Sequence, residues 1–276
     1  MNPFEYRTPQ DLNEVTTILS NNSHARVVSG NTDLINEIKD GIVSPRVMVS
    51  LSKIKELTQI TWSQDALIIG SMVTLKDLVS QEEINSKCPA ISQAANSVAT
   101  PQIRNLGTLG GNLCQRPRCW YYRSARFDCL KKGGDVCFAV DGLSRYHAIY
   151  GGANCHIVHP SDLATVLTSL NASIDIQGPG ESRNVPISRF FTGPELNIQS
   201  ENCLGPKEFI TSIRIPREYI CYTSTFVKAK ERSTLDFALV SAAVAIKKER
   251  NFISDALITL GGVAPVPWKL PYLERD

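Results

Sequence analysis

The sequence of 276 residues predicts an α+β fold, and two observations support this expectation. Segments with helical and with strand periodicity alternate up to residue 200. Strand-like segments dominate after a polar stretch at 201–207 that contains Gly and Pro and marks a domain boundary. With 42% hydrophobic and 20% charged residues, the chain can bury a large core, as one large domain or two ordinary ones.

The first segments predict a small α+β unit, residues 1–58. Thr8 and Pro9 precede apolar residues at helical spacing. This order predicts a helix with Thr8 as its cap and Pro9 at its first position, where the missing N–H has no cost. Strands are expected at 26–29 and 47–50, and a second helix at 34–40.

The remaining elements predict a second subdomain, 59–200, and a C-terminal domain, 205–276. Two short apolar runs separated by a polar turn predict a hairpin, and Ser161 is placed to cap an amphipathic helix. The elements expected are strands at 60–62, 67–70, 173–177, 209–215, 221–228, 238–246 and 252–260, and helices at 74–79, 89–97 and after Ser161.

The charge balance and the hydropathy pattern exclude two classes of partner. Lys plus Arg (29) nearly equals Asp plus Glu (27), so no overall field attracts nucleic acid or an anionic membrane. The N-terminus lacks the apolar core of a signal peptide, and no apolar run is long enough to span a bilayer. We therefore expect a cytoplasmic protein without a membrane span.

Two glycine-containing segments could bind phosphate through backbone N–H groups. Residues 27–33 read as a strand and a turn in which Gly30 can adopt a positive φ, although an ordinary tight turn has the same pattern. Residues 107–112 combine three glycines with the Thr108 hydroxyl and the Asn112 amide. The dinucleotide pattern Gly-x-Gly-x-x-Gly and a Walker lysine are absent, which disfavours a Rossmann or P-loop site.

Five of the eight cysteines lie between Cys114 and Cys155. In a reducing compartment such a cluster favours metal binding over disulfides. The spacing is too wide for a ferredoxin and too irregular for a zinc ribbon, so an iron–sulfur cluster and zinc both remain open. Several basic residues of this segment could offset thiolate charge or form a solvated docking surface: Arg116, Arg118, Arg123, Arg126, Lys131 and Lys132.

Four motifs, in order along nearly the whole chain, resemble the FAD-binding subunit of molybdenum hydroxylases, the xanthine dehydrogenase family. They are residues 27–34, residues 103–112, His159-Pro-Ser-Asp162, and the segment from Lys228 through Arg232 and Asp236 to Val244. The cysteine pattern resembles the subgroup of periplasmic aldehyde oxidoreductases, whose FAD subunit carries an additional 4Fe-4S cluster.

The resemblance implies an FAD domain of the vanillyl-alcohol-oxidase (PCMH) type, with two α+β subdomains and a C-terminal α+β domain that is truncated relative to the family. It implies that Asp162 hydrogen-bonds FAD and that Lys228 lies near the isoalloxazine ring, although a solvated lysine at a strand end has the same pattern. Asn31 replaces a second glycine of the family. The other FAD contacts implied are Val28, Ser29, Gly30, Asn31, Thr32, Asp33, Leu34, Thr108, Gly111 and Asn112.

The resemblance also selects the cluster ligands within an insert at 114–155. They are Cys119, Cys129, Cys137 and Cys155, while Cys114 is spare. Four thiolates would equally satisfy zinc and hold the loop without electron transfer, so a structural zinc site is the alternative.

By this resemblance the chain is an electron-transfer subunit of a molybdenum hydroxylase. A molybdopterin-binding large subunit and a 2Fe-2S small subunit are the expected partners, in a heterotrimer or its dimer, and FAD passes electrons to an external acceptor. Complexes of the subgroup can be exported to the periplasm as folded assemblies, so the resemblance permits either compartment for this chain. The alternatives are a stand-alone NAD(P)H-dependent flavin reductase and a truncated, non-catalytic docking subunit with a structural metal site.

Overall fold

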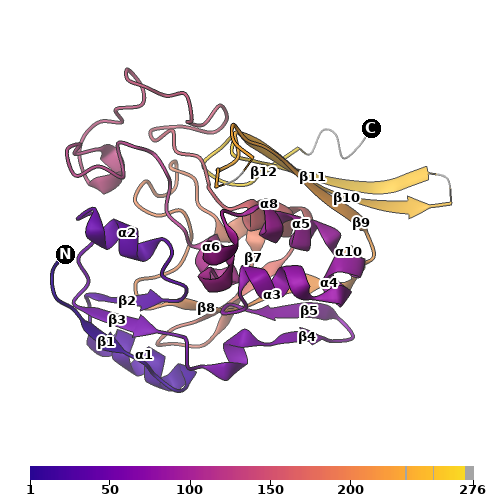
Figure 1. Ribbon diagram of the computed structural model, residues 1–276, viewed down its shortest axis with the longest axis horizontal. Coiled ribbons are helices and arrows are strands. Elements are labelled where there is room, and N and C mark those ends of the chain that lie inside the picture. The colour runs from indigo at the N-terminus through magenta and orange to yellow at the C-terminus, as the bar shows by residue number, and fades with distance from the viewer. Residues whose placement is uncertain (234, 251, 271–276) are drawn as a thin grey trace.

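The computed structural model describes residues 1–233, 235–250 and 252–270. Its N-terminal part is a parallel sheet in the order β1-β3-β2, with α1 and α2 beside it (Figure 1). Its elements are β1 (Glu5–Arg7), α1 (Leu12–Asn21), β2 (Ala25–Val28), α2 (Leu34–Lys39) and β3 (Val47–Ser50). The elements predicted at 26–29, 34–40 and 47–50 are thereby confirmed, with ends that differ by at most one residue.

The first helix begins later than predicted. Asp11 is the N-cap of α1, and its carboxylate accepts a hydrogen bond of 2.9 Å from the Glu14 N–H. The Glu14 carboxylate in turn accepts from the Gln10 N–H at 2.8 Å. These two bonds occupy backbone donors at the helix start, so Thr8 and Pro9 lie outside the helix and the predicted Thr8 cap is wrong.

A five-stranded antiparallel sheet forms the middle of the molecule, in the order β4-β5-β8-β6-β7. The predicted hairpin is confirmed by the pairing of β4 with β5. β8 follows the stretch 201–207, yet it pairs with both β5 and β6, so the chain leaves this sheet only after Pro216. The strands are β4 (Ile60–Trp62), β5 (Ala66–Gly70), β6 (Ser173–Gln177), β7 (Arg183–Pro186) and β8 (Phe209–Pro216).

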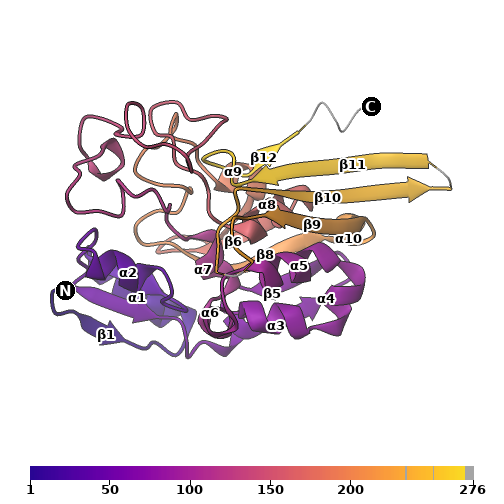
Figure 2. The same cartoon turned by 45° about the horizontal axis from the view of Figure 1, so that its top comes forward.

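A four-stranded antiparallel sheet, β12-β11-β10-β9, follows. Helices α5 and α8 lie between it and the five-stranded sheet (Figure 2), and side chains from both sheets and these helices share one core. The strands are β9 (Thr223–Ala229), β10 (Val240–Glu249), β11 (Phe252–Gly261) and β12 (Trp268–Lys269). The remaining helices are η1 (Lys55–Thr58), α3 (Leu75–Ser80), α4 (Glu82–Lys87), α5 (Pro89–Ser97), α6 (Pro101–Leu106), α7 (Leu109–Leu113), η2 (Leu130–Lys132), α8 (Asp162–Ser169), α9 (Ile187–Phe190) and α10 (Arg217–Ile220).

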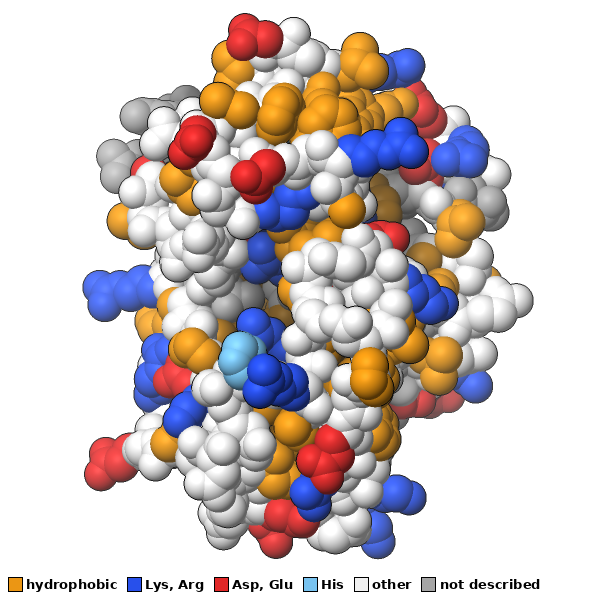
Figure 3. Space-filling view, turned by 90° about the vertical axis from the view of Figure 1, so that its left-hand side faces the viewer, with side chains coloured by type: hydrophobic (Ala, Val, Ile, Leu, Met, Phe, Trp, Pro, Cys, Tyr) orange, Lys and Arg blue, Asp and Glu red, His pale blue; other side chains and the backbone are white. Residues whose placement is uncertain are grey.

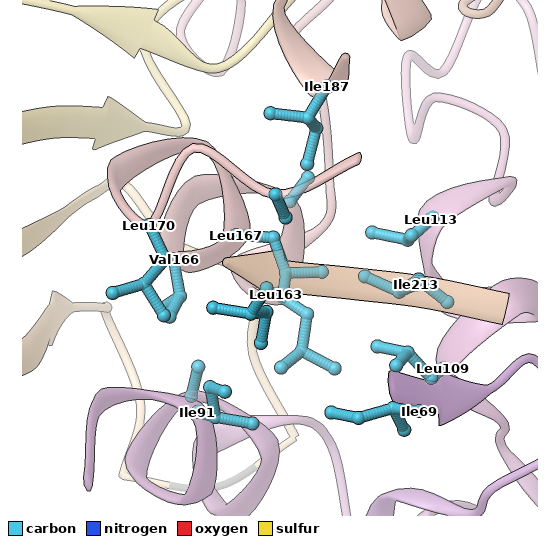
Figure 4. Packing of buried hydrophobic residues seen from close by; sticks show 14 of the residues in the cluster. Ile69, Ile91, Leu109, Leu113, Leu163, Val166, Leu167, Leu170, Ile187 and Ile213 are labelled. Atoms are coloured by element: carbon cyan, nitrogen blue, oxygen red, sulfur yellow. The ribbon is translucent and has the colours of Figure 1, made fainter. Parts of the chain in front are cut away.

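Helix α8 is the centre of this core. Ser161 accepts a hydrogen bond from the Ala164 N–H at 3.0 Å, which confirms the predicted cap. Every residue of α8 is buried. Figure 4 shows Leu163 and Leu167 among side chains from α5, α7 and β8. Burial of each such leucine stabilises the fold by about 2 kcal/mol.

The segment between α7 and α8 contains the cysteine-rich insert and has little regular structure, with η2 as its helical turn. It lies beside α2 at the upper left of Figure 1. Within the described ranges, no helix combines the length and hydrophobicity that crossing a bilayer requires.

Candidate functional site

The loop from β2 to α2 has the geometry of a close backbone contact. A Cβ at Gly30 would lie 2.0 Å from the Leu106 carbonyl oxygen, so only glycine fits there. Gly30 does not have the positive φ that the sequence suggested. Asn31 adopts the left-handed conformation instead, with a φ of 60°, and asparagine tolerates this region better than most residues.

The amide groups of this loop are available to a ligand. Within the part of the chain that the structure describes, the backbone N–H groups of 29–34 make no hydrogen bond to protein. The same residues line a cavity of about 770 Å³. A row of unbonded N–H groups at a cavity wall is the arrangement that binds phosphate oxygens.

The second glycine loop, residues 107–112, closes the cavity, but most of its backbone N–H groups already donate hydrogen bonds to protein atoms. It forms the start of α7, where the Thr108 hydroxyl accepts from the Gly111 N–H at 3.2 Å. Thr108 also donates to the Ser29 hydroxyl at 3.1 Å, which joins the two loops. The Gly110 N–H donates to the Ser71 carbonyl at 2.9 Å. Cβ atoms at Gly110 and Gly111 would approach Ser71 and Ser29 within 2.8 and 2.7 Å, so these glycines allow close packing.

The structure divides the predicted FAD contacts into two groups. Residues 28–34, Thr108 and Gly111 line the cavity. Asn112 does not line it: its side-chain oxygen accepts from the Ser161 hydroxyl at 2.5 Å, and Asn112 is buried. Asp162 and Lys228 also lie outside the cavity lining.

Asp162 and Lys228 form a buried ion pair, with Lys228 Nζ 2.6 Å from Asp162 Oδ2. The exposed fractions of their side chains are 6% and 4%, so the solvated strand-end alternative for Lys228 is wrong. The Ser97 hydroxyl also donates to Asp162 Oδ2, at 3.3 Å. Burial raises the pKa of Asp162, and the Lys228 ammonium opposes this rise.

Asp33 anchors the cysteine-rich insert to the first loop. Its carboxylate accepts hydrogen bonds from the Arg116 N–H at 2.7 Å, Arg118 Nη1 at 2.5 Å and Arg123 Nη2 at 2.8 Å. The guanidinium groups of Arg118 and Arg123 are therefore paired with this carboxylate, with side chains 29% and 13% exposed, rather than fully solvated. Figure 3 shows Lys and Arg side chains on the walls of a hollow in this face of the molecule.

Two buried glutamates that sequence reasoning missed complete this charge network. Glu37 accepts from the Tyr122 hydroxyl at 2.6 Å, and Arg116 Nε donates to the same hydroxyl oxygen at 3.0 Å. Glu201 pairs with Lys131 and with Arg116 Nη1, the latter at 3.1 Å. Burial raises the pKa of Glu37. Because Glu201 lies 85 residues after Arg116, no local pattern reveals the pair.

The four cysteines selected by the resemblance line a second, small pocket together with Tyr122, Lys131 and His147. Cys114 lies apart from them. It lines the large cavity, near Cys203 and Glu201, and burial raises its pKa to about 12. The four members of the pocket are Cys119, Cys129, Cys137 and Cys155.

The donors of this pocket suit a soft metal, because thiolates prefer zinc and iron–sulfur clusters. Burial raises the pKa of Cys155 to about 11 and that of Cys119 in the same direction, so both thiols are protonated at neutral pH unless a metal displaces the proton. Within the described residues, no group of three or more His, Cys, Asp or Glu side chains is positioned closely enough to ligate a single ion. The four thiols thus share a pocket but are not in the geometry of a single-ion site.

His147 contacts the pocket from its wall. Its Nε2 lies 3.2 Å from Cys119 Sγ, and burial lowers its pKa. Its Nδ1 is buried without a hydrogen-bond partner among the described residues. Trp120 packs edge-on against the imidazole, with ring centroids 5.3 Å apart. The His147 ring is therefore held against one of the four thiols by packing.

The amide-lined cavity has the hydrogen-bond donors that a phosphate-bearing cofactor requires. Residues 2–218 match the family model described as "FAD binding domain in molybdopterin dehydrogenase". The chain belongs to this family of FAD-binding oxidoreductase subunits, and the fold class predicted from the sequence is confirmed.

Similar proteins come from several organisms. The aldehyde oxidoreductase FAD-binding subunit PaoB of Escherichia coli (strain K12) is 30% identical over 89% of this chain and 77% of its own length. The glyceraldehyde dehydrogenase medium chain of Sulfolobus acidocaldarius is 26% identical over 99% of this chain and 80% of its own. A carbon monoxide dehydrogenase structure from Hydrogenophaga pseudoflava has the same fold, with a TM-score of 0.74 and 24% identity over 98% of this chain and 78% of its own.

Proposed function

We propose that this chain binds FAD in the 770 Å³ cavity and transfers electrons within a molybdenum hydroxylase complex. The unbonded N–H groups of 29–34 carry this proposal, because they offer a diphosphate a row of donors. FAD would supply the redox chemistry, since a flavin accepts single electrons and releases two at once. The chain supplies binding and orientation.

The proposal assigns roles to the predicted FAD residues other than Asn112, whose side chain bonds to Ser161. Residues 28–34 would line the diphosphate, with the unbonded N–H groups of 29–34 as donors, while Thr108 and Gly111 would support this loop beside Ser29. The Asp33 side chain is already bonded to insert groups, so it contributes to FAD binding by fixing the loop. Asp162 and Lys228 act as a neutral buried pair beside the site.

The four cysteines of the small pocket are proposed to hold a 4Fe-4S cluster. Their common pocket and their buried, aromatic surroundings support this assignment over a solvated loop. Their spacing resembles the aldehyde oxidoreductase subgroup, and the similarity to the Escherichia coli FAD-binding subunit points the same way. The competing assignment is a zinc ion, which would require these thiols to move closer together, since no single-ion geometry is present among the described residues.

Two further subunits are proposed as partners: a molybdopterin-binding large subunit and a 2Fe-2S small subunit. The similar dehydrogenase chains of Sulfolobus acidocaldarius and Hydrogenophaga pseudoflava are both called medium chains, which supports an assembly with other subunits. The Hydrogenophaga pseudoflava structure belongs to an enzyme with a molybdenum cofactor, although that structure lacks the Mo-pyranopterin moiety of the cofactor. In such an assembly substrate oxidation belongs to the molybdenum subunit, and electrons reach the FAD of this chain through the small subunit.

One set of measurements on the purified protein tests the proposal. We expect flavin bands over a broad cluster absorbance, one FAD per chain, and four irons with four sulfides per chain. A colourless protein that contains zinc would contradict both cofactor assignments. Flavin with zinc would leave FAD binding intact and refute only the cluster. Rapid bleaching of the flavin by NADPH in the isolated chain would favour the stand-alone reductase.

A further inference from the structure

Two side chains belong to both pockets. Tyr122 and Lys131 line the large cavity and also the cysteine pocket, and both are buried. Tyr122 follows Cys119 by three positions and Lys131 follows Cys129 by two, so the insert that carries the cysteines also builds the wall of the cavity. The two proposed cofactor sites are therefore separated by shared side chains.

Lys131 is the cation of this wall. Its side chain is 3% exposed, and its ammonium pairs with Glu201 and donates to the Ile198 carbonyl at 2.6 Å. Because Lys131 lines both pockets and is shielded from solvent, its charge lies in the buried wall between the two proposed cofactor sites. In such a low-dielectric position a charge acts more strongly than in water.

We propose that Lys131 is a positioning residue whose buried ammonium sets the reduction potentials of both the cysteine-held cluster and the flavin. This inference rests on the proposed function. A fixed positive charge stabilises the reduced, more negative form of each centre, and Glu201 attenuates this effect from the other side of the ammonium. The Lys131 charge consequently affects the reduction potentials of the cluster and of the flavin in the same direction.

The test is a redox titration of the holoprotein that follows the flavin by visible absorbance and the cluster by electron paramagnetic resonance. Lys131→Met should lower the midpoint potentials of both centres. Glu201→Gln should raise both, because it leaves the ammonium without its carboxylate. The two variants should therefore shift the midpoint potentials in opposite directions. A general loosening of the wall would not produce opposite shifts.

Lys132→Met is the matched control. Lys132 is the next residue and lines the large cavity, but it does not line the cysteine pocket, and its ammonium donates to the Tyr121 and Ser124 carbonyls. This variant should leave the cluster potential at the native value.

The outcomes separate the inference from the function on which it rests. If native protein contains FAD and a cluster but Lys131→Met shifts only one potential or neither, the inference is refuted and the proposed function stands. An equal cluster shift in Lys131→Met and Lys132→Met would also refute it. If native protein contains no cluster, the cluster assignment and the inference fail together.

Discussion

Lys228 Nζ lies 2.6 Å from Asp162 Oδ2 in a buried ion pair that joins β9 to the N-terminus of α8. The two residues come from different layers of the molecule, and each is the charge partner of the other. Because neither lines the large cavity, their first role is to fix the four-stranded sheet against the central helix.

Lys228→Met should destabilise the protein by about 3 kcal/mol or more, because it leaves a buried carboxylate unpaired. The double variant with Asp162→Asn should be more stable than that single variant. Urea unfolding of the purified protein measures both differences. Strictly additive losses in the double variant would show that the pair is not energetically coupled.

Gly30→Ala should reduce FAD affinity at least about tenfold, because the added Cβ would collide with the Leu106 carbonyl and displace the amide-bearing loop. Fluorescence titration of the flavin-free protein with FAD measures this change. Gly180→Ala is the control, since a Cβ there has no atom within 4 Å. Native affinity in Gly30→Ala would contradict the assignment of this loop to the diphosphate.

Asp33→Asn should lower both the iron and the FAD content of purified protein. The carboxylate holds three groups of the insert, and an amide oxygen without charge would bind the guanidinium groups more weakly. Asp40→Asn serves as the control, because Asp40 is exposed at the end of α2. Iron, sulfide and flavin analyses give the answer; unchanged iron in Asp33→Asn would show that the insert folds without this anchor.

Serine substitutions should distinguish the proposed ligands from the other cysteines. Loss of any one of the four thiols that line the small pocket should abolish stable 4Fe-4S binding. Cys114→Ser should retain iron, since Cys114 lies in the wall of the other cavity. Loss of the cluster in Cys114→Ser, with retention in one of the four, would reassign the ligand set.

His159 should make the stability of the protein depend on pH. Burial lowers its pKa to about 3, against 6.5 for an unperturbed histidine, so below pH 6.5 the unfolded chain binds a proton that the folded chain does not. The free energy of unfolding should therefore fall as the pH drops through 6.5, by up to about 1.4 kcal/mol per pH unit.

Urea unfolding at several pH values tests this dependence. His159→Gln should show a shallower decline than the native protein. His24→Gln should follow the native slope, because His24 is exposed. Equal slopes in all three proteins would assign the acid sensitivity to other groups.

Local patterns predicted most of the regular structure. The limits of α5 follow from Pro89 at its first position, and those of β3 from a compact apolar run. Five short α-helices of the described residues, α4, α6, α7, α9 and α10, were not predicted, because few apolar residues mark them at helical spacing. The start of α1 was misplaced because Thr8 and Asp11 are both acceptable caps and only the bonds formed in the structure distinguish them.

The site was less predictable because its contacts join distant residues. The glycine loops could be located from composition, yet the Asp33 bonds to the insert connect positions 83 to 90 residues apart. The sequence also could not separate Asn112 from Gly111. They are adjacent, but one faces the large cavity and the other bonds to Ser161.

The bond between Asn112 and Ser161 spans 49 positions and bridges the two places where the chain leaves and re-enters the compact body. Those places are therefore neighbours in space, and a link of a few residues could replace the whole intervening segment without moving α7 or α8. Removal of the segment would leave these two helices in place but would open the large cavity, because Tyr122 and Lys131 of the segment line its wall.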